Sequence, residues 1–130
     1  MKSNKGFTLI ELLAVIVILA IIALIATPLT LNVINSAKTK AAENSAYGVL
    51  DAARLYYAEA MMDDTKMNKV NKKDNAKVTI ADLSVSGDKP SDTTLEVTYN
   101  TDGTVTIPTM AFDNGCYSIT SSVVKAETCS

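Results

Sequence analysis

The chain has 130 residues, enough for one small domain plus an additional segment. Its net charge of −2, with acidic and basic residues intermixed, provides no basic face for nucleic acid, so we expect no direct nucleic-acid partner. The absence of histidine removes the commonest acid–base catalyst and metal ligand. We also find no nucleophile–base pair, phosphate loop or metal cluster, and we therefore expect neither an enzyme nor a bound cofactor or metal.

Residues 1–6 form a short basic leader, which we exclude from the fold as a processing segment. The positive charges of Lys2 and Lys5 predict that the leader stays in the cytoplasm and that the bulk of the chain lies outside. An ordinary secretory signal is cut after its apolar region, but Pro28 makes that position a poor cleavage site. A cut before the apolar region would leave the hydrophobic segment in the mature protein.

Residues 7–31 are predicted to form a helix long enough to span a bilayer. The segment is apolar on every side, so it must be covered all round by lipid or by other helices. Glu11 is its single carboxylate, and an ionisable group in a membrane-length helix indicates a functional residue. We expect Glu11 to favour a bundle of identical helices; the alternative is a carboxylate that pairs with its own chain's amine or reaches the headgroups.

Pro28 lies near the end of this segment and removes one backbone donor. We expect a kink or local loosening there because the following residues remain compatible with a helix. The alternative is that Pro28 marks the end of the membrane helix.

Residues 32–62 are predicted to form an amphipathic continuation of the same helix, with Met62 as its last residue. Polar and charged residues mostly occupy the other side, and Gly48 is interpreted as a tolerated weak point. Three tyrosines at helical spacing, Tyr47, Tyr56 and Tyr57, are expected in the core or at an interface. The apolar positions expected on one face are Val33 or Ile34, Ala37, Ala41, Val49, Ala53, Tyr56 or Tyr57, and Ala60.

Residues 63–130 are predicted to hold a loop followed by β-structure. Residues 63–76 are polar without a period and are expected to be an exposed loop. Residues 79–83 fit either a strand or one helical turn. Alternating segments at 95–99, 104–107 and 116–120 predict strands, with turns at 100–103 and 113–115. Residues 121–126 are expected to form a fourth short strand. The predicted fold is α+β: a long helix whose second half packs on a small antiparallel sheet, with Leu95, Val97, Val105 and Ile107 facing Ala53, Tyr56 and Ala60.

Cys116 and Cys129 are the only cysteines and lie thirteen positions apart. Behind an export anchor, two cysteines indicate one disulfide, which would staple a β-region too small for a large core.

The N-terminal segment combines the basic leader, a Gly-Phe junction, one acid at a fixed offset and a later proline: Gly6, Phe7, Thr8, Leu9, Ile10, Glu11, Leu12, Leu13 and Pro28. It resembles the class III signal peptide and N-terminal helix of type IV pilins and of the pseudopilins of type II secretion and competence systems. The resemblance implies that a prepilin peptidase cuts between Gly6 and Phe7 and methylates the new Phe7 amine. It also supports the loosened helix at Pro28.

We therefore expect a structural subunit of a type IV pilus that polymerises with identical subunits, through pairing of Glu11 with the Phe7 amine of a neighbour, for adhesion or motility. It would wait in the cytoplasmic membrane and be extended by the pilus assembly machinery as a surface filament. One alternative is a pseudopilin of a secretion or DNA-uptake system. Another is a membrane-anchored binding module that never polymerises.

Overall fold

The computed structural model describes residues 6–130, and the chain forms two compact units, one ending at Ala37 and the other running from Lys38 to Ser130. Lys2 and Lys5 of the expected leader lie outside the described residues. Helix α1 (Leu9–Ala60) supplies its first part to the first unit and its second part to the second unit.

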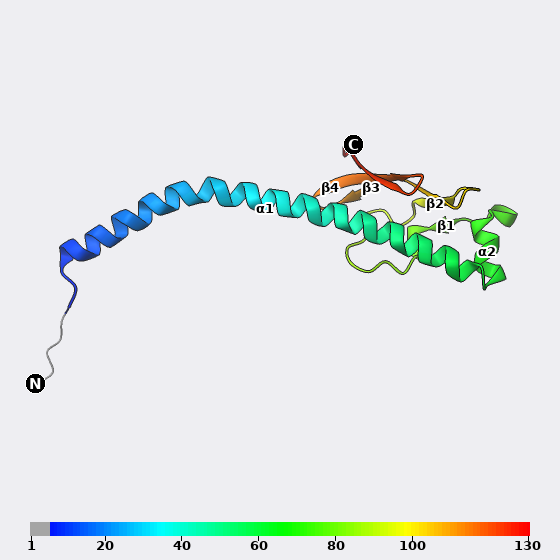
Figure 1. The fold of residues 1–130 in the computed structure, drawn as a ribbon, viewed down its shortest axis with the longest axis horizontal. Coiled ribbons are helices and arrows are strands. Elements are labelled where there is room, and N and C mark those ends of the chain that lie inside the picture. The colour runs from blue at the N-terminus through cyan, green and yellow to red at the C-terminus, as the bar shows by residue number, and fades with distance from the viewer. Residues whose placement is uncertain (1–5) are drawn as a thin grey trace, which may run out of the picture. The chain divides into compact units, whose positions relative to one another are not determined.

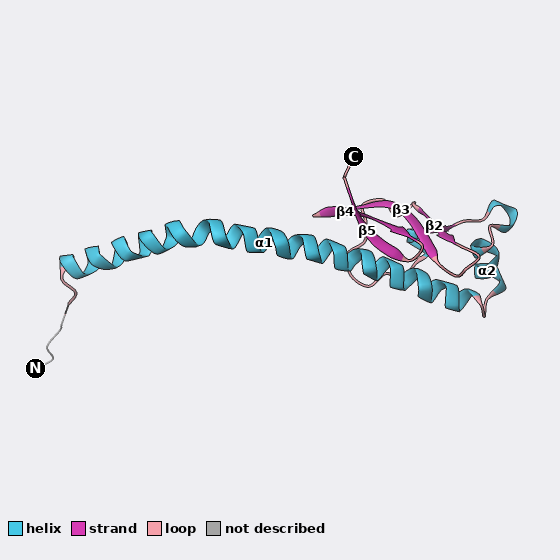
Figure 2. Ribbon diagram, turned by 45° about the horizontal axis from the view of Figure 1, so that its top comes forward, coloured by secondary structure: helices cyan, strands magenta, loops and turns pink. Residues whose placement is uncertain are grey.

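The second unit contains an antiparallel sheet of five strands, which lies along the part of α1 that belongs to this unit (Figure 1). Each strand pairs with the next one in the chain, so the sheet is a simple meander. Strands β2 to β5 are seen side by side in Figure 2. The strands are β1 (Val78–Thr79), β2 (Glu96–Tyr99), β3 (Val105–Phe112), β4 (Gly115–Thr120) and β5 (Val123–Glu127). The predicted α+β fold is confirmed.

One hydrophobic core joins α1 to the sheet within this unit. From α1 it takes mostly small side chains, which let the sheet approach the helix closely. The predicted contact between the two is confirmed, since the expected residues of both elements lie in one cluster. The buried members on α1 are Ala42, Ala46, Val49, Leu50, Ala52, Ala53, Tyr56 and Ala60, and the main sheet members are Val78, Val97, Val105, Ile107, Met110, Phe112, Tyr117 and Ile119, with Leu95 partly buried.

The expected buried face of α1 was wrong at its N-terminal end. Burial begins only at Ala42. The expected positions before it are all exposed: Val33, Ile34, Ala37 and Ala41. The helical period was correct, but a period does not tell where along the helix a covering layer starts. Tyr56 is buried and Tyr57 is half-buried, whereas Tyr47 is exposed.

The prediction that residues 63–76 form only an irregular loop was also wrong. They contain α2 (Asp64–Val70) and a short 3-10 helix η1 (Lys73–Asn75). Asp63 caps α2, because its carboxylate accepts hydrogen bonds from the backbone nitrogens of Thr65 and Lys66. Val70, the last residue of α2, is buried and ties this short helix to the core.

The ambiguous segment after residue 78 contains both of the expected alternatives. Strand β1 is followed at once by a 3-10 turn, η2 (Ile80–Asp82). Asp82 accepts hydrogen bonds from the nitrogen and hydroxyl of Thr79 and from Lys69 of α2. One carboxylate thus holds the turn and α2 together.

Two tyrosine hydroxyls attach the sheet to main-chain carbonyls of α1. Tyr99 of β2 donates to Ala53 over 2.8 Å, and Tyr117 of β4 donates to Thr39 over 3.1 Å. Burial raises the pKa of the Tyr99 hydroxyl, so this donor keeps its proton well into the alkaline range. The two bonds are more than three helical turns apart along α1, and they fix the sheet lengthwise on the helix.

Gly48 has a packing role that goes beyond a tolerated weak point. A Cβ atom at this position would lie 3.2 Å from the carbonyl oxygen of Ser86. The loop after η2 therefore passes directly over α1 here, and glycine leaves the space for it.

The predicted pairing of the two cysteines is present as a disulfide between Cys116 of β4 and Cys129 near the C-terminus. The predicted turns at both hairpins are present as well, and Gly103 takes the left-handed conformation, with a φ of 83°.

Candidate functional site

Helix α1 begins with a reciprocal pair of hydrogen bonds between Thr8 and Glu11. The backbone nitrogen of Thr8 donates to Oε2 of Glu11 over 3.0 Å, and the nitrogen of Glu11 donates to the Thr8 hydroxyl oxygen over 3.3 Å. This arrangement is a capping box, which satisfies two backbone donors that no helical carbonyl can reach. Glu11 therefore stabilises the start of its own helix in the single chain.

Sequence reasoning counted Thr8 only among the residues of the N-terminal motif and missed this box. The signal was present, because Thr-Leu-Ile-Glu has the Thr-x-x-Glu spacing immediately before an apolar run. The acid at the start of α1 thus has two candidate roles, as a cap within the chain and as a charge available to a neighbour.

Gly6 and Phe7 precede the helix and have little contact with the rest of the chain. A Cβ atom built on Gly6 would meet no atom within 4 Å, and Phe7 is 87% exposed. Nothing in the described fold requires a glycine at this position. In the described chain Phe7 follows Gly6, so its nitrogen is an amide, and the pairing of a free Phe7 amine with Glu11 remains a prediction.

The part of α1 in the first unit presents an apolar surface all round. Every described residue of this unit, from Gly6 to Ala37, is exposed, including more than a dozen leucines, isoleucines and valines. Thr27 and Thr30 do not interrupt this surface, because each hydroxyl donates to a carbonyl of the preceding turn. Of the described helices, α1 alone is long and apolar enough to cross a membrane.

Pro28 lies inside α1, and the helix continues beyond it for many residues. Pro28 therefore does not end α1, and the point at which its membrane-spanning part ends stays a prediction. Proline removes the bond that residue 28 would donate to the carbonyl of Leu24, so the backbone is less restrained at this point. The predicted kink remains a prediction.

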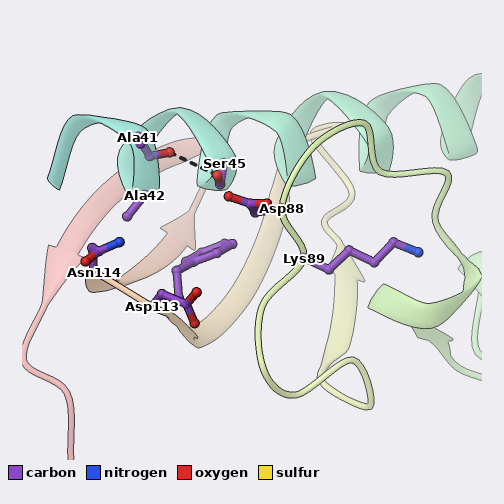
Figure 3. A pocket seen from close by; sticks show the side chains of 8 residues that line it. Ala41, Ala42, Ser45, Asp88, Lys89, Asp113 and Asn114 are labelled. Carbon is purple, nitrogen blue, oxygen red and sulfur yellow. Dashed lines mark hydrogen bonds between the residues drawn. The ribbon is translucent and has the colours of Figure 1, made fainter. Parts of the chain in front are cut away.

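The second unit has a small surface pocket of about 150 Å³ between α1 and two turns (Figure 3). Asp88, Asp113 and Asn114 line it from the turns, and Ser45 lines it from α1, donating its hydroxyl to Ala41. Lys89 points away from it (Figure 3). Within residues 6–130, no group of three or more His, Cys, Asp or Glu side chains could hold a metal ion.

Comparison with protein families gives a match to the N-terminal segment. Residues 1–27 match the family model described as the prokaryotic N-terminal methylation motif. This segment is the class III signal peptide of type IV pilins and pseudopilins. The signal peptide motif covers the capping box and most of the apolar run, and it ends just before Pro28.

The motif supports a coarse classification of the protein. It supports membership of the type IV pilin or pseudopilin family, whose members are structural rather than enzymatic, and it implies processing by a prepilin peptidase. The apolar part of α1 fits anchoring in a membrane before assembly. No curated protein and no solved structure matches the chain.

Proposed function

We propose that this chain is the structural subunit of a type IV pilus, which polymerises with copies of itself through the N-terminal part of α1. The observation that carries this proposal is the uncovered apolar surface of residues 9–37 combined with the signal peptide motif at its start. Lipid covers such a surface before assembly, and neighbouring helices of identical subunits cover it in a filament. The pseudopilin alternative uses the same surface in a shorter fibre.

In this proposal Glu11 acts twice. In the single subunit it completes the capping box with Thr8. After the leader is removed, the methylated amine of Phe7 stays cationic, and Glu11 of one subunit pairs with the Phe7 amine of a neighbour. Removal of one partner from such a buried pair costs about 3–5 kcal/mol, because the other charge is left without compensation.

Gly6 in this proposal serves the prepilin peptidase and not the fold. The open space around it supports this role, since a side chain there would disturb nothing in the described chain. A larger residue at position 6 is therefore expected to block cleavage while leaving the rest of the chain folded.

The deciding experiment separates the charge of Glu11 from its capping function. Glu11→Gln retains a side chain that completes a capping box but carries no charge. Thr8→Ala removes the cap and leaves the charge. Each variant is expressed as the full chain, and the sheared surface fraction is analysed by intact mass for a chain that begins at methylated Phe7.

We expect Glu11→Gln to be cleaved and inserted in the membrane but absent from the sheared fraction. We expect Thr8→Ala to assemble, with about 1 kcal/mol of helix stability lost. If Glu11→Gln assembles normally while Thr8→Ala does not, Glu11 is a cap alone and the intersubunit pairing is wrong.

The same fractions distinguish the alternatives. A mature wild-type chain found only in the membrane, together with a secretion or DNA-uptake defect on deletion, would establish a pseudopilin. A mature chain that never polymerises under any condition would establish an anchored binding module. A chain that still begins at Met1 would contradict processing and, with it, the filament.

A further inference from the structure

Strand β5 contributes almost nothing to the hydrophobic core. The buried cluster ends in chain order at Ile119 of β4, and only Val124 of β5 packs partly against it. The other four residues of β5 are exposed. Burial of apolar surface is what fixes most strands in place, so β5 needs another source of attachment.

The turn that leads into β5 is held in an unfavourable conformation. Ser121 and Ser122 both have positive φ, at 51° and 61°. Such left-handed backbone is costly for residues other than glycine. Ser122 is restrained by Val105 of β3, which accepts from its nitrogen and donates to its hydroxyl. The entrance to β5 is thus fixed from outside the strand.

The far end of β5 is fixed by covalent and polar contacts. In the sheet register Cys116 lies opposite Glu127, and Cys129 follows two residues later to close the disulfide. Glu127 also accepts a hydrogen bond of 2.7 Å from the hydroxyl of Ser118. Between these two ends, the five register pairs with β4 and the partial burial of Val124 hold the strand.

We propose that β5 is a strap latched by the Cys116–Cys129 disulfide, and that reduction releases residues 123–130 from β4 while α1 and strands β1 to β4 stay folded. The step requires a dithiol reductant. One thiolate of the dithiol attacks a sulfur of the disulfide, and its second thiol completes the exchange. The protein gains two electrons and two protons as two cysteine thiols, and the dithiol becomes a cyclic disulfide.

Release of the strap would leave the outer edge of β4 without a partner. An unpaired strand edge is a template for pairing with another chain. The latch therefore keeps an edge closed once the chain has reached an oxidising compartment, and this role does not depend on how the chain assembles.

The test compares amide hydrogen exchange of the full chain in detergent micelles before and after treatment with dithiothreitol. A disulfide that closes a loop of this size changes the opening equilibrium by roughly 100-fold. We expect protection of residues 123–127 to fall by about that factor, while protection of β3 and of α1 from Ala46 to Tyr56 is unchanged. A second readout is alkylation of Cys116, which is 4% exposed when the strap is closed.

The matched control is Cys116→Ser combined with Cys129→Ser. It should exchange like the reduced wild type and should not respond to dithiothreitol. If the double variant does not fold, reduction of the folded wild type still gives the result. Unchanged protection of β5 after complete reduction would overturn the proposal, and so would loss of protection throughout the second unit.

Discussion

The two parts of helix α1 are both rich in apolar residues but have opposite surroundings. In residues 9–37 every side chain is exposed, whereas in residues 38–60 eight side chains are buried against the rest of the second unit. Isoleucine, leucine and valine dominate the first part, while alanine is the commonest buried residue of the second. Large side chains provide area for a partner outside the chain, and small ones allow a sheet of the same chain to lie close.

Ionisable groups follow the same division. Among the described residues of the first unit, Glu11 is the only one with an ionisable side chain. The second unit contains ion pairs of Lys69 with Asp82 and of Lys72 and Lys77 with Glu96. One unit is thus suited to lipid or to other helices, and the other is a self-contained water-exposed domain with its own core.

A matched pair of isoleucine variants should give the largest contrast between the two units. Ile119 is fully buried in β4, and Ile16 is 53% exposed in α1. We expect Ile119→Ala to lower the free energy of unfolding of the second unit by about 2–5 kcal/mol, because it leaves a cavity. Ile16→Ala should leave that stability unchanged. Thermal unfolding followed by near-ultraviolet circular dichroism measures this, since all five tyrosines lie in the second unit.

One result of this experiment would contradict the contrast between the two units. If Ile16→Ala destabilised the second unit as much as Ile119→Ala, the first part of α1 would contribute to the core. The division into an uncovered and a self-contained unit would then be wrong.

The sequence predicted the features that depend on local pattern. The apolar run, the alternation in strands β2 to β4, the Asn100–Gly103 turn and the pairing of Cys116 with Cys129 each have a short-range signature. The start of burial at Ala42 has no short-range signature in the sequence, because it depends on where the sheet ends in space.

The structural elements that the sequence analysis missed have only weak signals in the sequence. Helix α2 has only seven residues and is rich in lysine, so its polar surface was interpreted as a loop, although Asp63 was available as a cap and Val70 as an anchor. The extension of β3 to Phe112 includes Pro108, which weakens a strand prediction. The capping box at Glu11 was missed because Glu11 was interpreted only as an acid beside an apolar run.

Acid should weaken the second unit through its hydrogen-bonded carboxylates. Burial opposes the charged form of Asp82, but hydrogen bonds from Lys69 and Thr79 outweigh it and hold the pKa of Asp82 below its usual 3.8. A carboxyl group with a lowered pKa in the folded state stabilises the fold above its unfolded pKa, and this contribution is lost as the pH falls through the folded pKa. The loss therefore lies below about pH 4.

This acid sensitivity is measured as the pH dependence of thermal unfolding. We expect Asp82→Asn to be less stable than wild type at neutral pH and to show a flatter decline below pH 4. Asp88→Asn is the matched control, because Asp88 is an exposed carboxylate in a loop. An identical acid profile for Asp82→Asn and wild type would show that Lys69 and Thr79 do not stabilise the charged carboxylate.

The smallest effect should come from the turn before β5, where the strain and the anchoring contact lie on neighbouring residues. Asparagine tolerates the left-handed conformation better than serine, so Ser121→Asn should raise the free energy of unfolding by about 0.5 kcal/mol. Ser122→Gly relieves the same kind of strain but removes the hydroxyl that accepts from the nitrogen of Val105, which offsets the gain. Chemical denaturation of both variants checks this order. If Ser122→Gly proved the more stable of the two, the contact with Val105 would contribute little to the stability of this turn.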